Sequence, residues 1–520
     1  MEDTVYSTLA VVLSLANSST TQSLLEDIRA DDLAMQLHAQ VVKAALLIAL
    51  STATASPAGA AASAPAPSRR PEPPREGVDW DSFGFSLNGV RTDFMYVATC
   101  TTNGVSEGED PWLVPCGSSS GSSDDAAGED GFSSNRYSGG GRIVPHAPIA
   151  MDPASTVLNY GQVLFEGLKA IRRPDGSIVV FRPESNAKRM ADGARRLCMP
   201  PVSEELFVEA ITQTVRANCA WVPPAGKGAL YLRPLLLGSG GALGVGPSPE
   251  YTFLVYCSPV GGYFKKKKVG KSAGGTGAAG GLTEDEGEGD GRGAAPFVPP
   301  PPIRLLMTPR FHRSVEGGVG SIKASGNYAP CFKASKQIKA VGYDEVLFLD
   351  AKSDAFVEEA GASNFFAVGG PDGRTLFTPG LGRGSILPGI TRASIVELAR
   401  SEDFGLTVVE GDLAVDELLC ANEAFCCGTG ATITPVGVVA LERGGGVGGA
   451  AAPTEAGARE TGSLGAGHRR VTFPHVDESA EGDAGAMVAG PVTTRLAERM
   501  AGILAGTMPD KFGWIHHVYK

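Results

Sequence analysis

The fold can be inferred from the stretch Ser321-Ile-Lys-Ala-Ser-Gly-Asn-Tyr328, which places one lysine among small and apolar neighbours in a turn. Two further stretches supply chemistry that complements this lysine. Val357-Glu-Glu-Ala-Gly-Ala-Ser-Asn364 puts Glu359 directly after a segment with the character of a buried strand. Ser385-Ile-Leu-Pro-Gly-Ile-Thr-Arg392 is a Pro-Gly turn that opens a helix. The free N–H groups at such a helix N-terminus bind phosphate.

These three stretches together meet the requirements of pyridoxal phosphate, an aldehyde cofactor. A lysine forms a Schiff base with its aldehyde, an acid keeps its pyridine nitrogen protonated, and backbone N–H groups hold its phosphate. The ordinary alternative for Lys323 is a surface lysine, but the residue lies in a Gly/Ser-rich turn and not on a polar helix face. The sequence therefore predicts a pyridoxal-phosphate site.

Composition narrows the class of protein. The chain has 520 residues, enough for two domains, and its formal net charge of −12 argues against a nucleic-acid partner. Its nine cysteines are scattered without a Cys-x-x-Cys pair, which is typical of reduced thiols. Only seven histidines occur and no His-Glu-x-x-His motif is present, so we expect no metal site.

The N-terminal residues 1–77 are predicted to be a targeting segment, mostly disordered. Residues 33–71 contain no acid and are rich in Ala, Ser and Pro, as organelle presequences are. Residues 1–32 are acidic and fit this interpretation poorly, although translation from Met35 would remove them. The apolar run of the segment, from Ala44 to Leu50, is too short to cross a bilayer, so no membrane partner is expected. The expected location is the plastid, with mitochondrion or cytoplasm as alternatives.

Three low-complexity segments interrupt the chain at residues 116–141, 265–299 and 443–468. None offers enough apolar surface to offset the entropy of ordering it, so we expect surface insertions. The run Lys265 to Lys268 is interpreted as a solvated loop and not as a nucleic-acid patch. Gly444 to Gly449 fits a dinucleotide-binding spacing, but no amphipathic helix follows it.

Between the insertions, strand and helix patterns alternate, which predicts an α+β fold of two domains with the site in the cleft between them. The small domain is expected at residues 78–258, the interdomain connection at 259–302, and the large cofactor-binding domain at 303–520. Expected strands include 168–173, 177–181, 230–237, 251–257, 303–308, 345–350, 365–368, 376–378 and 406–409. Expected helices are 186–198, 204–219, 329–341, 391–400 and 492–505.

From about residue 78 onward the chain resembles the branched-chain amino-acid aminotransferases of the fold-type IV pyridoxal-phosphate group, in the style of plant and algal plastid members. The resemblance rests on the order and spacing of short motifs. These are Leu158-Asn-Tyr-Gly-Gln162, Leu164-Phe-Glu-Gly-Leu-Lys-Ala170, Phe181-Arg-Pro183 with Asn186, Tyr231-Leu-Arg-Pro-Leu-Leu236, Gly326-Asn-Tyr328, Glu359 with Asn364, Ile386-Leu-Pro-Gly-Ile390 and Gly428-Thr-Gly430.

The resemblance implies a role for each cofactor-binding residue. Lys323 would carry the Schiff base and move the α-proton, and burial would lower its pKa as both tasks require. Glu359 would keep the pyridine nitrogen protonated, with Glu358 as its competitor. The residues implied to contact the phenolic oxygen or the phosphate are Tyr328, Arg182, Leu387, Gly389, Ile390, Thr391 and Thr429.

For the substrate, the resemblance implies Tyr160, Phe165, Tyr231, Arg233 and the Thr429-Gly430 backbone. Tyr231 and Arg233 alternate with leucines and so share one face of a strand. A charge on that apolar strand favours carboxylate recognition; a structural ion pair is the alternative. The implied substrates are leucine, isoleucine or valine with 2-oxoglutarate, and the implied assembly is a homodimer.

The sequence also departs from the family pattern. Animal members can carry a Cys-x-x-Cys pair where this chain has Ala431 and Thr434, so we expect no redox switch there. Cys426 and Cys427 are expected to pack in a buried strand, with redox sensing as the minority interpretation. The rival functions are a D-amino-acid aminotransferase, an aminodeoxychorismate lyase, or a non-catalytic relative that kept the fold.

Overall fold

The computed structural model describes residues 70–85, 90–101, 141–261, 297–430, 432–442, 468–473, 476–477 and 486–519. All of these fall in one unit of the chain, residues 64–520. Most of the expected targeting segment, nearly all of the three expected insertions, and Ala431 lie outside the described residues. Within the described ranges, every helix is too short or too polar to span a bilayer.

The first sheet has eight strands in the order β2-β1-β7-β6-β4-β5-β20, with β3 paired to β6. Its strands are β1 (Phe94–Thr101), β2 (Arg142–Pro145), β3 (Val163–Phe165), β4 (Leu168–Arg172), β5 (Ile178–Phe181), β6 (Ala229–Gly238), β7 (Glu250–Val260) and β20 (Ile515–His517). The expected strands 168–173 and 177–181 form a hairpin, because β4 and β5 pair in antiparallel register.

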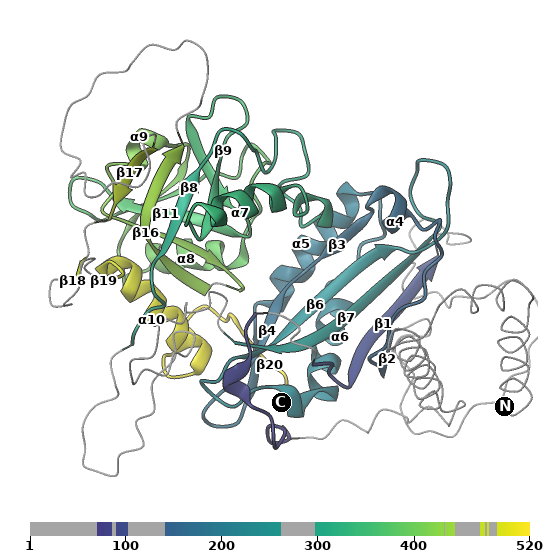
Figure 1. The fold of residues 1–520 in the computed structure, drawn as a ribbon. Coiled ribbons are helices and arrows are strands. Elements are labelled where there is room, and N and C mark those ends of the chain that lie inside the picture. The colour runs from purple at the N-terminus through teal and green to yellow at the C-terminus, as the bar shows by residue number, and fades with distance from the viewer. Residues whose placement is uncertain are drawn as a thin grey trace, which may run out of the picture. The chain divides into compact units, whose positions relative to one another are not determined.

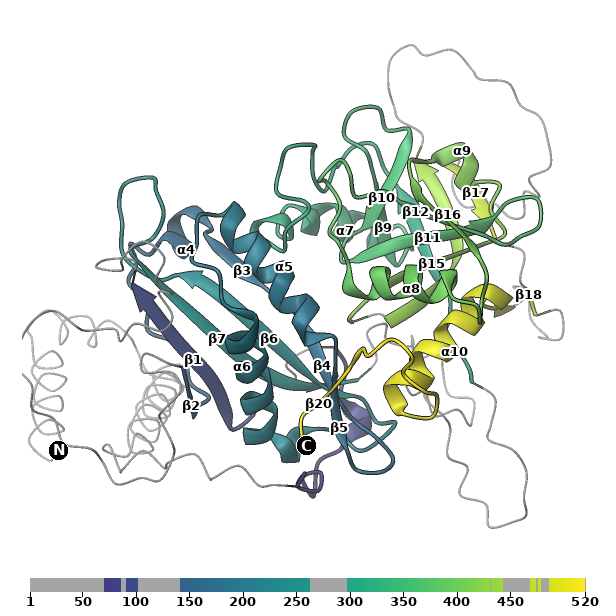
Figure 2. The same cartoon turned by 180° about the vertical axis from the view of Figure 1, so that it is seen from behind.

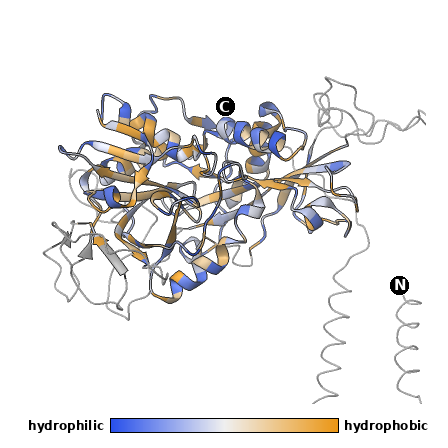
Figure 3. Ribbon diagram, turned by 90° about the horizontal axis from the view of Figure 1, so that it is seen from above, coloured by the Kyte–Doolittle hydropathy of each residue, from blue (hydrophilic) through white to orange (hydrophobic). Residues whose placement is uncertain are grey.

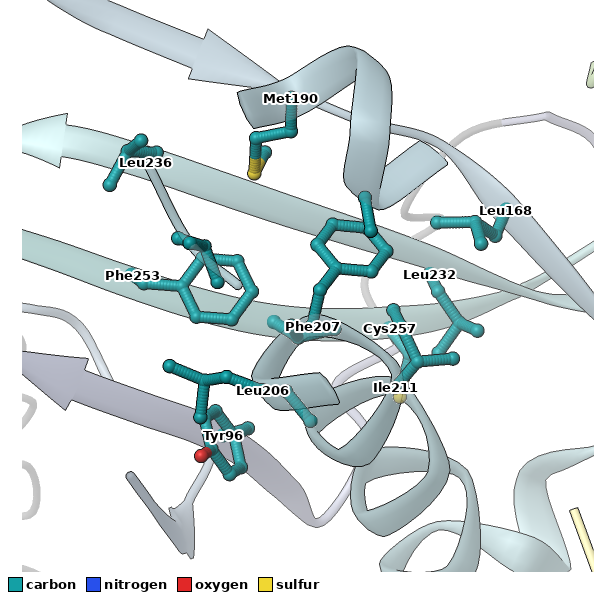
Figure 4. Close-up of a cluster of buried hydrophobic side chains, with 14 of the residues drawn as sticks. Tyr96, Leu168, Met190, Leu206, Phe207, Ile211, Leu232, Leu236, Phe253 and Cys257 are labelled. Atoms are coloured by element: carbon teal, nitrogen blue, oxygen red, sulfur yellow. The ribbon is translucent and has the colours of Figure 1, made fainter. Parts of the chain in front are cut away.

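Two helices, α5 (Pro183–Arg196) and α6 (Glu204–Ala217), cover one face of this sheet in both views (Figure 1, Figure 2). Ser203 caps α6 by accepting a hydrogen bond from Leu206 N at 3.2 Å, which satisfies one N–H left free at the helix start. The core between helices and sheet includes Phe207 and Phe253, whose ring centroids lie 5.9 Å apart (Figure 4).

The opposite face of the first sheet carries polar side chains. In β4, Leu168 and Ala170 enter the core beneath the helices, so Lys169 between them points to the other face. Leu230 and Leu232 of β6 do the same, which turns Tyr231 and Arg233 away from the core. This alternation brings the polar residues of the site onto one surface.

The second sheet has ten strands in the order β13-β12-β11-β15-β16-β8-β9-β10-β14, with β17 paired to β16. An additional pairing of β10 with β11 closes six of these strands into a barrel. The strands are β8 (Ile303–Met307), β9 (Glu345–Leu349), β10 (Phe356–Ala360), β11 (Ser363–Gly369), β12 (Thr375–Pro379), β13 (Thr407–Gly411), β14 (Leu413–Ala414), β15 (Glu423–Gly428), β16 (Thr432–Glu442) and β17 (His468–Thr472).

Helices around the second sheet bury one side each, and in Figure 3 they alternate between hydrophilic and hydrophobic colour. α8 (Ile390–Arg400) and α10 (Pro491–Ala505) share a core with Phe366 and Phe425, which stack at 4.9 Å. α7 (Cys331–Ala340) packs on β9. The remaining elements with assigned bounds are η1 (Trp80–Ser82), α4 (Thr156–Tyr160), η2 (Cys219–Trp221), η3 (Ser325–Asn327), α9 (Val415–Leu418), β18 (Val476–Asp477) and β19 (Ala486–Met487).

The observed boundaries correct two of the predicted ones. Glu72 N donates to Cys219 Sγ at 3.2 Å and Arg75 N donates to Ala220 O at 2.8 Å. Residues from about 72 therefore pack with the first sheet and not with a targeting segment that ends at 77. β20 pairs with β5, so the C-terminal strand belongs to the first sheet although it was assigned to the large domain. Backbone hydrogen bonds are non-local in both cases, and no local sequence pattern reports them.

We predict that Phe207→Ala lowers the free energy of unfolding by about 3–5 kcal/mol, because it removes a fully buried ring and leaves a cavity. Urea denaturation followed by tryptophan fluorescence measures the change. Phe332→Ala is the matched control, because that ring is 68% exposed and its removal should cost less than about 0.5 kcal/mol. Equal effects of the two variants would contradict the assignment of this core.

Candidate active site

The turn around the lysine is built by its own polar side chains. Asn327 Nδ2 donates to Val319 O at 2.8 Å and to Ile322 O at 3.0 Å, which closes the segment 319–328 that we call the lysine turn. The turn is also anchored to the first sheet, because Phe165 N donates to Lys323 O at 3.2 Å. Ile322 and Ala324 are buried in that sheet's core. The lysine backbone is therefore fixed on both sides of the side chain.

The Lys323 amine lies in an apolar and aromatic environment. Its Nζ donates to Tyr328 Oη at 3.0 Å and lies 4.7 Å from the centroid of the Phe165 ring. Burial, followed by the nearby charge of Arg189, lowers the pKa of Lys323 to about 8. Burial also raises the pKa of Tyr328 to about 12, so its hydroxyl keeps its proton. The amine can therefore lose its proton near neutral pH.

Glu359 lies in β10 itself and not after it, directly opposite Asn364 in the hairpin with β11. Its Oε2 accepts from Asn364 Nδ2 at 3.1 Å, and its Oε1 accepts from Leu387 N at 2.9 Å. Arg313 Nη1 lies 2.7 Å from the same Oε1 in a pair with both side chains buried. Burial raises the pKa of Glu359 to about 7, although Arg313 opposes this.

The structure distinguishes the two candidate glutamates. Glu359 is near enough to Lys323 for that charge to act on its pKa. Glu358 instead accepts a hydrogen bond from Ser385 Oγ, and within the described part of the chain its buried Oε2 has no hydrogen-bond partner. Of the pair, Glu359 is therefore the one that is bonded to the Leu387 turn and lies near the lysine.

The predicted helix entry is present, with Gly389 as N-cap and α8 beginning at Ile390. Asn364 Nδ2 donates to Leu387 O at 2.9 Å, which ties this turn to Glu359. A Cβ on Gly389 would lie 1.9 Å from Asn364 Oδ1, so only glycine fits there. The first N–H groups of α8, including those of Ile390 and Thr391, have no partner within the helix. They form a site that suits a phosphate.

A buried arginine absent from the predicted set, Arg189, lies beside this helix entry. Its Nη1 donates to Pro388 O at 3.0 Å, and its Nε and Nη2 donate to Glu166 at 2.8 and 2.7 Å. Glu166 is fully buried and also accepts from Asn186 Nδ2 at 2.7 Å. The spacing Asn186-x-x-Arg189 places both residues on one helix face and could have pointed to Arg189. The sequence does not show that the Pro388 turn lies beside that face.

Arg182, the predicted phosphate ligand, is placed differently. Its Nη1 donates to Ser394 Oγ at 2.8 Å and lies 3.4 Å from Glu397 Oε2, further along α8 than the helix entry. Its side chain is 24% exposed, whereas the side chain of Arg189 is 9% exposed. The structure therefore brings Arg189, and not Arg182, next to Lys323 and the Pro388 turn.

The predicted substrate residues Phe165, Tyr231 and Arg233 come together. Arg233 Cζ lies 4.6 Å from the centroid of the Phe165 ring, the same ring that Lys323 contacts. Arg233 Nη2 donates to Tyr231 Oη at 3.1 Å, while its Nε is buried and has no acceptor among the described residues. A Cβ on Gly167 would lie 2.0 Å from that hydroxyl, so this glycine makes room for Tyr231.

Thr429 and Gly430 form the turn between β15 and β16, and Gly430 O accepts from Lys169 Nζ at 3.0 Å. Lys169 was not among the predicted site residues, although it stands in the Leu164–Ala170 motif. Tyr160 is not part of this group. Its ring is 43% exposed on α4, and its hydroxyl donates to Leu243 O at 2.6 Å.

The vicinal cysteines pack as predicted. Cys426 and Cys427 lie in β15 and are fully buried. Burial raises the pKa of the Cys426 thiol to about 12 and that of Cys427 well above its ordinary value. Thiolates are the reactive form, so these cysteines are poor redox sensors. Thr434 lies opposite Cys426 in β16 and is buried.

Comparisons with known proteins identify relatives of the chain. A family model described as amino-transferase class IV matches residues 296–439. The chain is 42% identical over 362 residues to branched-chain-amino-acid aminotransferase 5, chloroplastic, of Arabidopsis thaliana. This match covers 70% of each of the two chains. The chain is also 37% identical over 438 residues to branched-chain amino acid aminotransferase 1, mitochondrial, of Humulus lupulus, and that match covers 84% of each of the two chains.

Solved structures share the fold. The branched-chain amino acid aminotransferase of Escherichia coli superimposes with a TM-score of 0.52 at 24% identity, covering 72% of this chain and 97% of that chain. The T.th. branched-chain amino acid aminotransferase, solved in complex with N-(5'-phosphopyridoxyl)-L-glutamate, gives 0.51 at 25% identity, covering 72% of this chain and 96% of that chain. The predicted α+β, fold-type IV architecture is confirmed.

We predict that Lys323→Met stabilises the cofactor-free protein at pH 7 by about 2–3 kcal/mol, because the native state there holds an amine that burial disfavours in charged form. The native pKa of about 8 lies below the ordinary 10.5, so between these values the unfolded chain binds more protons. The penalty therefore shrinks as pH rises through this window.

Urea denaturation at pH 7 and pH 10.5 measures this difference between wild type and variant. At pH 10.5 the stabilisation should fall below about 1 kcal/mol. Lys188→Met, on the exposed side of α5, is the control and should change stability little at either pH. A difference that is the same at both values would show that Lys323 is not buried as a charged group.

Proposed function

The chain belongs to the branched-chain aminotransferase family of class IV aminotransferases, and we propose that it moves the amino group between leucine, isoleucine or valine and 2-oxoglutarate. One observation carries the choice of substrates. The Phe165 ring, which suits an apolar side chain, also contacts Arg233, a guanidinium whose Nε lacks an acceptor. One pocket can then admit both apolar and carboxylate side chains.

Pyridoxal phosphate is the cofactor, and the residues of the site fit it. Lys323 would attach its aldehyde carbon, Tyr328 would contact its phenolic oxygen, and Glu359 would face its pyridine nitrogen. Its phosphate would lie on the N–H groups of Ile390 and Thr391 with the Thr429 hydroxyl. When bound, the cofactor supplies an electron sink for the bonds at the substrate α-carbon.

The protein residues perform the proton transfers. The lowered pKa of Lys323 lets its amine accept the α-proton of the amino acid and return it at neutral pH. Glu359, held by Asn364 and Leu387 N, would accept a hydrogen bond from the ring nitrogen and keep that nitrogen protonated. The Phe165 ring shields the amine from water, which preserves its lowered pKa.

For the phosphate, we infer Arg189 in place of Arg182. Arg189 is held by Glu166 and by the Pro388 carbonyl, and two of its N–H groups remain for an anion. A guanidinium already fixed in place loses little entropy when a phosphate binds. Arg182 is engaged with Ser394 and Glu397 and is more exposed.

The proposed assembly is a homodimer. Five exposed apolar side chains belong to α4 and the loops beside the first sheet: Ile149, Leu158, Tyr160, Leu243 and Val245. Such side chains are favoured where another chain covers them. Tyr160 lies among them, so a role for Tyr160 at a substrate site would require a second copy of the chain.

The proposed location is the plastid. The acid-free composition of residues 33–71 supports it. Several relatives, among them the Arabidopsis thaliana protein, are named chloroplastic, and the 37% identical Humulus lupulus relative is named mitochondrial. Import of the full chain fused to a fluorescent protein distinguishes the two organelles.

Arg189→Lys should weaken pyridoxal-phosphate binding by about 10–100-fold, since charge-assisted hydrogen bonds are worth about 1.5–3 kcal/mol and lysine loses the two-point geometry. Arg182→Lys should change it by less than about threefold. Titration of the cofactor-free protein with pyridoxal phosphate, followed by absorbance, measures both affinities. The reverse ranking would return the phosphate to Arg182.

The proposed activity is tested with a panel of amino donors and 2-oxoglutarate. We expect leucine, isoleucine and valine all to serve, because an apolar pocket discriminates a methylene by only about 1–3 kcal/mol. Lys323→Ala should reduce turnover at least about 100-fold, and Lys188→Ala should not change it. Preference for a D-amino acid, or no turnover by the wild type, would overturn the proposal.

A further inference from the structure

Arg313 is a buried cation that contacts three separate stretches of the site. It follows β8 and precedes the lysine turn, and its side chain is only 2% exposed. Its Nη1 lies 2.7 Å from Glu359 Oε1. The same nitrogen donates to Ser385 O at 3.3 Å and, more weakly, to Gly320 O at 3.5 Å. One guanidinium nitrogen therefore joins the acid, the stretch that opens α8 and the lysine turn.

The lysine turn and the stretch before α8 approach each other closely at this point. Ser321 N donates to Gly384 O at 3.0 Å. A Cβ on Gly320 would lie 2.1 Å from Ser385 O, so only a glycine lets the two backbones touch. Arg313 is held by carbonyl oxygens from both backbones, and its charge therefore has a fixed position.

That fixed charge acts on the protonation of Glu359. Burial raises the pKa of Glu359 to about 7, whereas Arg313 and the hydrogen bond from Leu387 N lower it. Glu358 raises the same pKa and Lys323 lowers it, each by less than Arg313 does. Without Arg313 the carboxyl would take up a proton at neutral pH. A neutral carboxyl forms weaker hydrogen bonds than a carboxylate does.

We propose that Arg313 is a positioning residue that keeps Glu359 ionised and directed toward the ring nitrogen of pyridoxal phosphate. Arg313 acts through Glu359, because a positive charge 2.7 Å from Oε1 favours negative charge on that carboxylate. The ionised carboxylate in turn favours a proton on the ring nitrogen. The proposal rests on the proposed function through its cofactor. The alternative is a purely structural ion pair that fastens the two backbones together.

The test measures the binding of two probes to the full-length protein after removal of its cofactor. The probes are pyridoxal phosphate and its 1-deaza analogue, in which a C–H group replaces the ring nitrogen. Wild type should bind pyridoxal phosphate about 10–100-fold more tightly than the analogue, because only the former makes a charge-assisted hydrogen bond to Glu359. Arg313→Gln keeps a neutral donor and removes the charge. It should lower this ratio of affinities at least about fivefold, measured by absorbance of the bound probe.

A conservative variant separates charge from shape. Arg313→Lys retains the charge and should keep the ratio within about threefold of the wild-type value, even where the affinity for both probes falls. Arg310→Gln is the matched control. Arg310 also pairs with a glutamate, its Nη2 lying 2.7 Å from Glu442 Oε1, but its side chain is 52% exposed. This variant should leave both affinities within about twofold of wild type.

The ratio of affinities decides between the two roles of Arg313. Equal weakening of both probes by Arg313→Gln would leave the ratio unchanged, make Arg313 a structural link and overturn the proposal. If Arg313→Gln does not fold, Arg313→Lys decides, and a ratio more than about threefold below that of wild type overturns the proposal. A wild type that binds both probes equally overturns it as well. The ratio does not depend on turnover, so a wild type that prefers pyridoxal phosphate but does not transaminate leucine refutes only the proposed function.

Discussion

The site depends on the burial of one amine between two sheets. Lys323 belongs to a turn whose backbone is bonded to β3 of the first sheet through Phe165 N. Its amine lies near enough to Glu359, in the barrel of the second sheet, for its charge to act on the pKa of that carboxyl. Because Ile322 and Ala324 are packed in the first core, the lysine backbone is held in place. Its lowered pKa, and with it the capacity to move a proton, follows from that packing.

Burying charged side chains lowers the stability of the folded protein, and ion pairs offset part of this loss. Arg189 with Glu166 and Arg313 with Glu359 place each guanidinium within 2.7 Å of a carboxylate. Breaking either pair would leave an isolated charge in a low-dielectric interior, which is far costlier than the pair itself. Lys323, Lys169 and Arg233 remain without acids among the described residues. We propose that the cofactor and the substrate bring the compensating charges to these cations.

The two halves of the site meet through few but specific contacts. Arg189 on α5 donates to Pro388 O, and Lys169 on β4 donates to Gly430 O. Each links a side chain of the first sheet or of the helix that covers it to a turn of the second sheet that is expected to bind an anion.

The sequence by itself determined the lysine, the helix entry and the α+β order, and it limited the acid to Glu359 and its competitor Glu358, because these features are local. A Pro-Gly turn, a Gly/Ser-rich turn and the alternation around Arg233 can be recognised within a few residues. It also determined that Cys426 and Cys427 pack in a strand. Family motifs added the substrate class, which no local pattern contains.

Only the tertiary structure decided which arginine lies at the helix entry, because Arg182 and Arg189 stand seven residues apart and both accompany helix α5. The choice depends on Pro388, nearly two hundred residues away in sequence. The same holds for Glu359 over Glu358, for Lys169 at Gly430, and for β20 in the first sheet. A sequence pattern reports the face of one element, whereas these residues are selected by where a second, distant element packs against it.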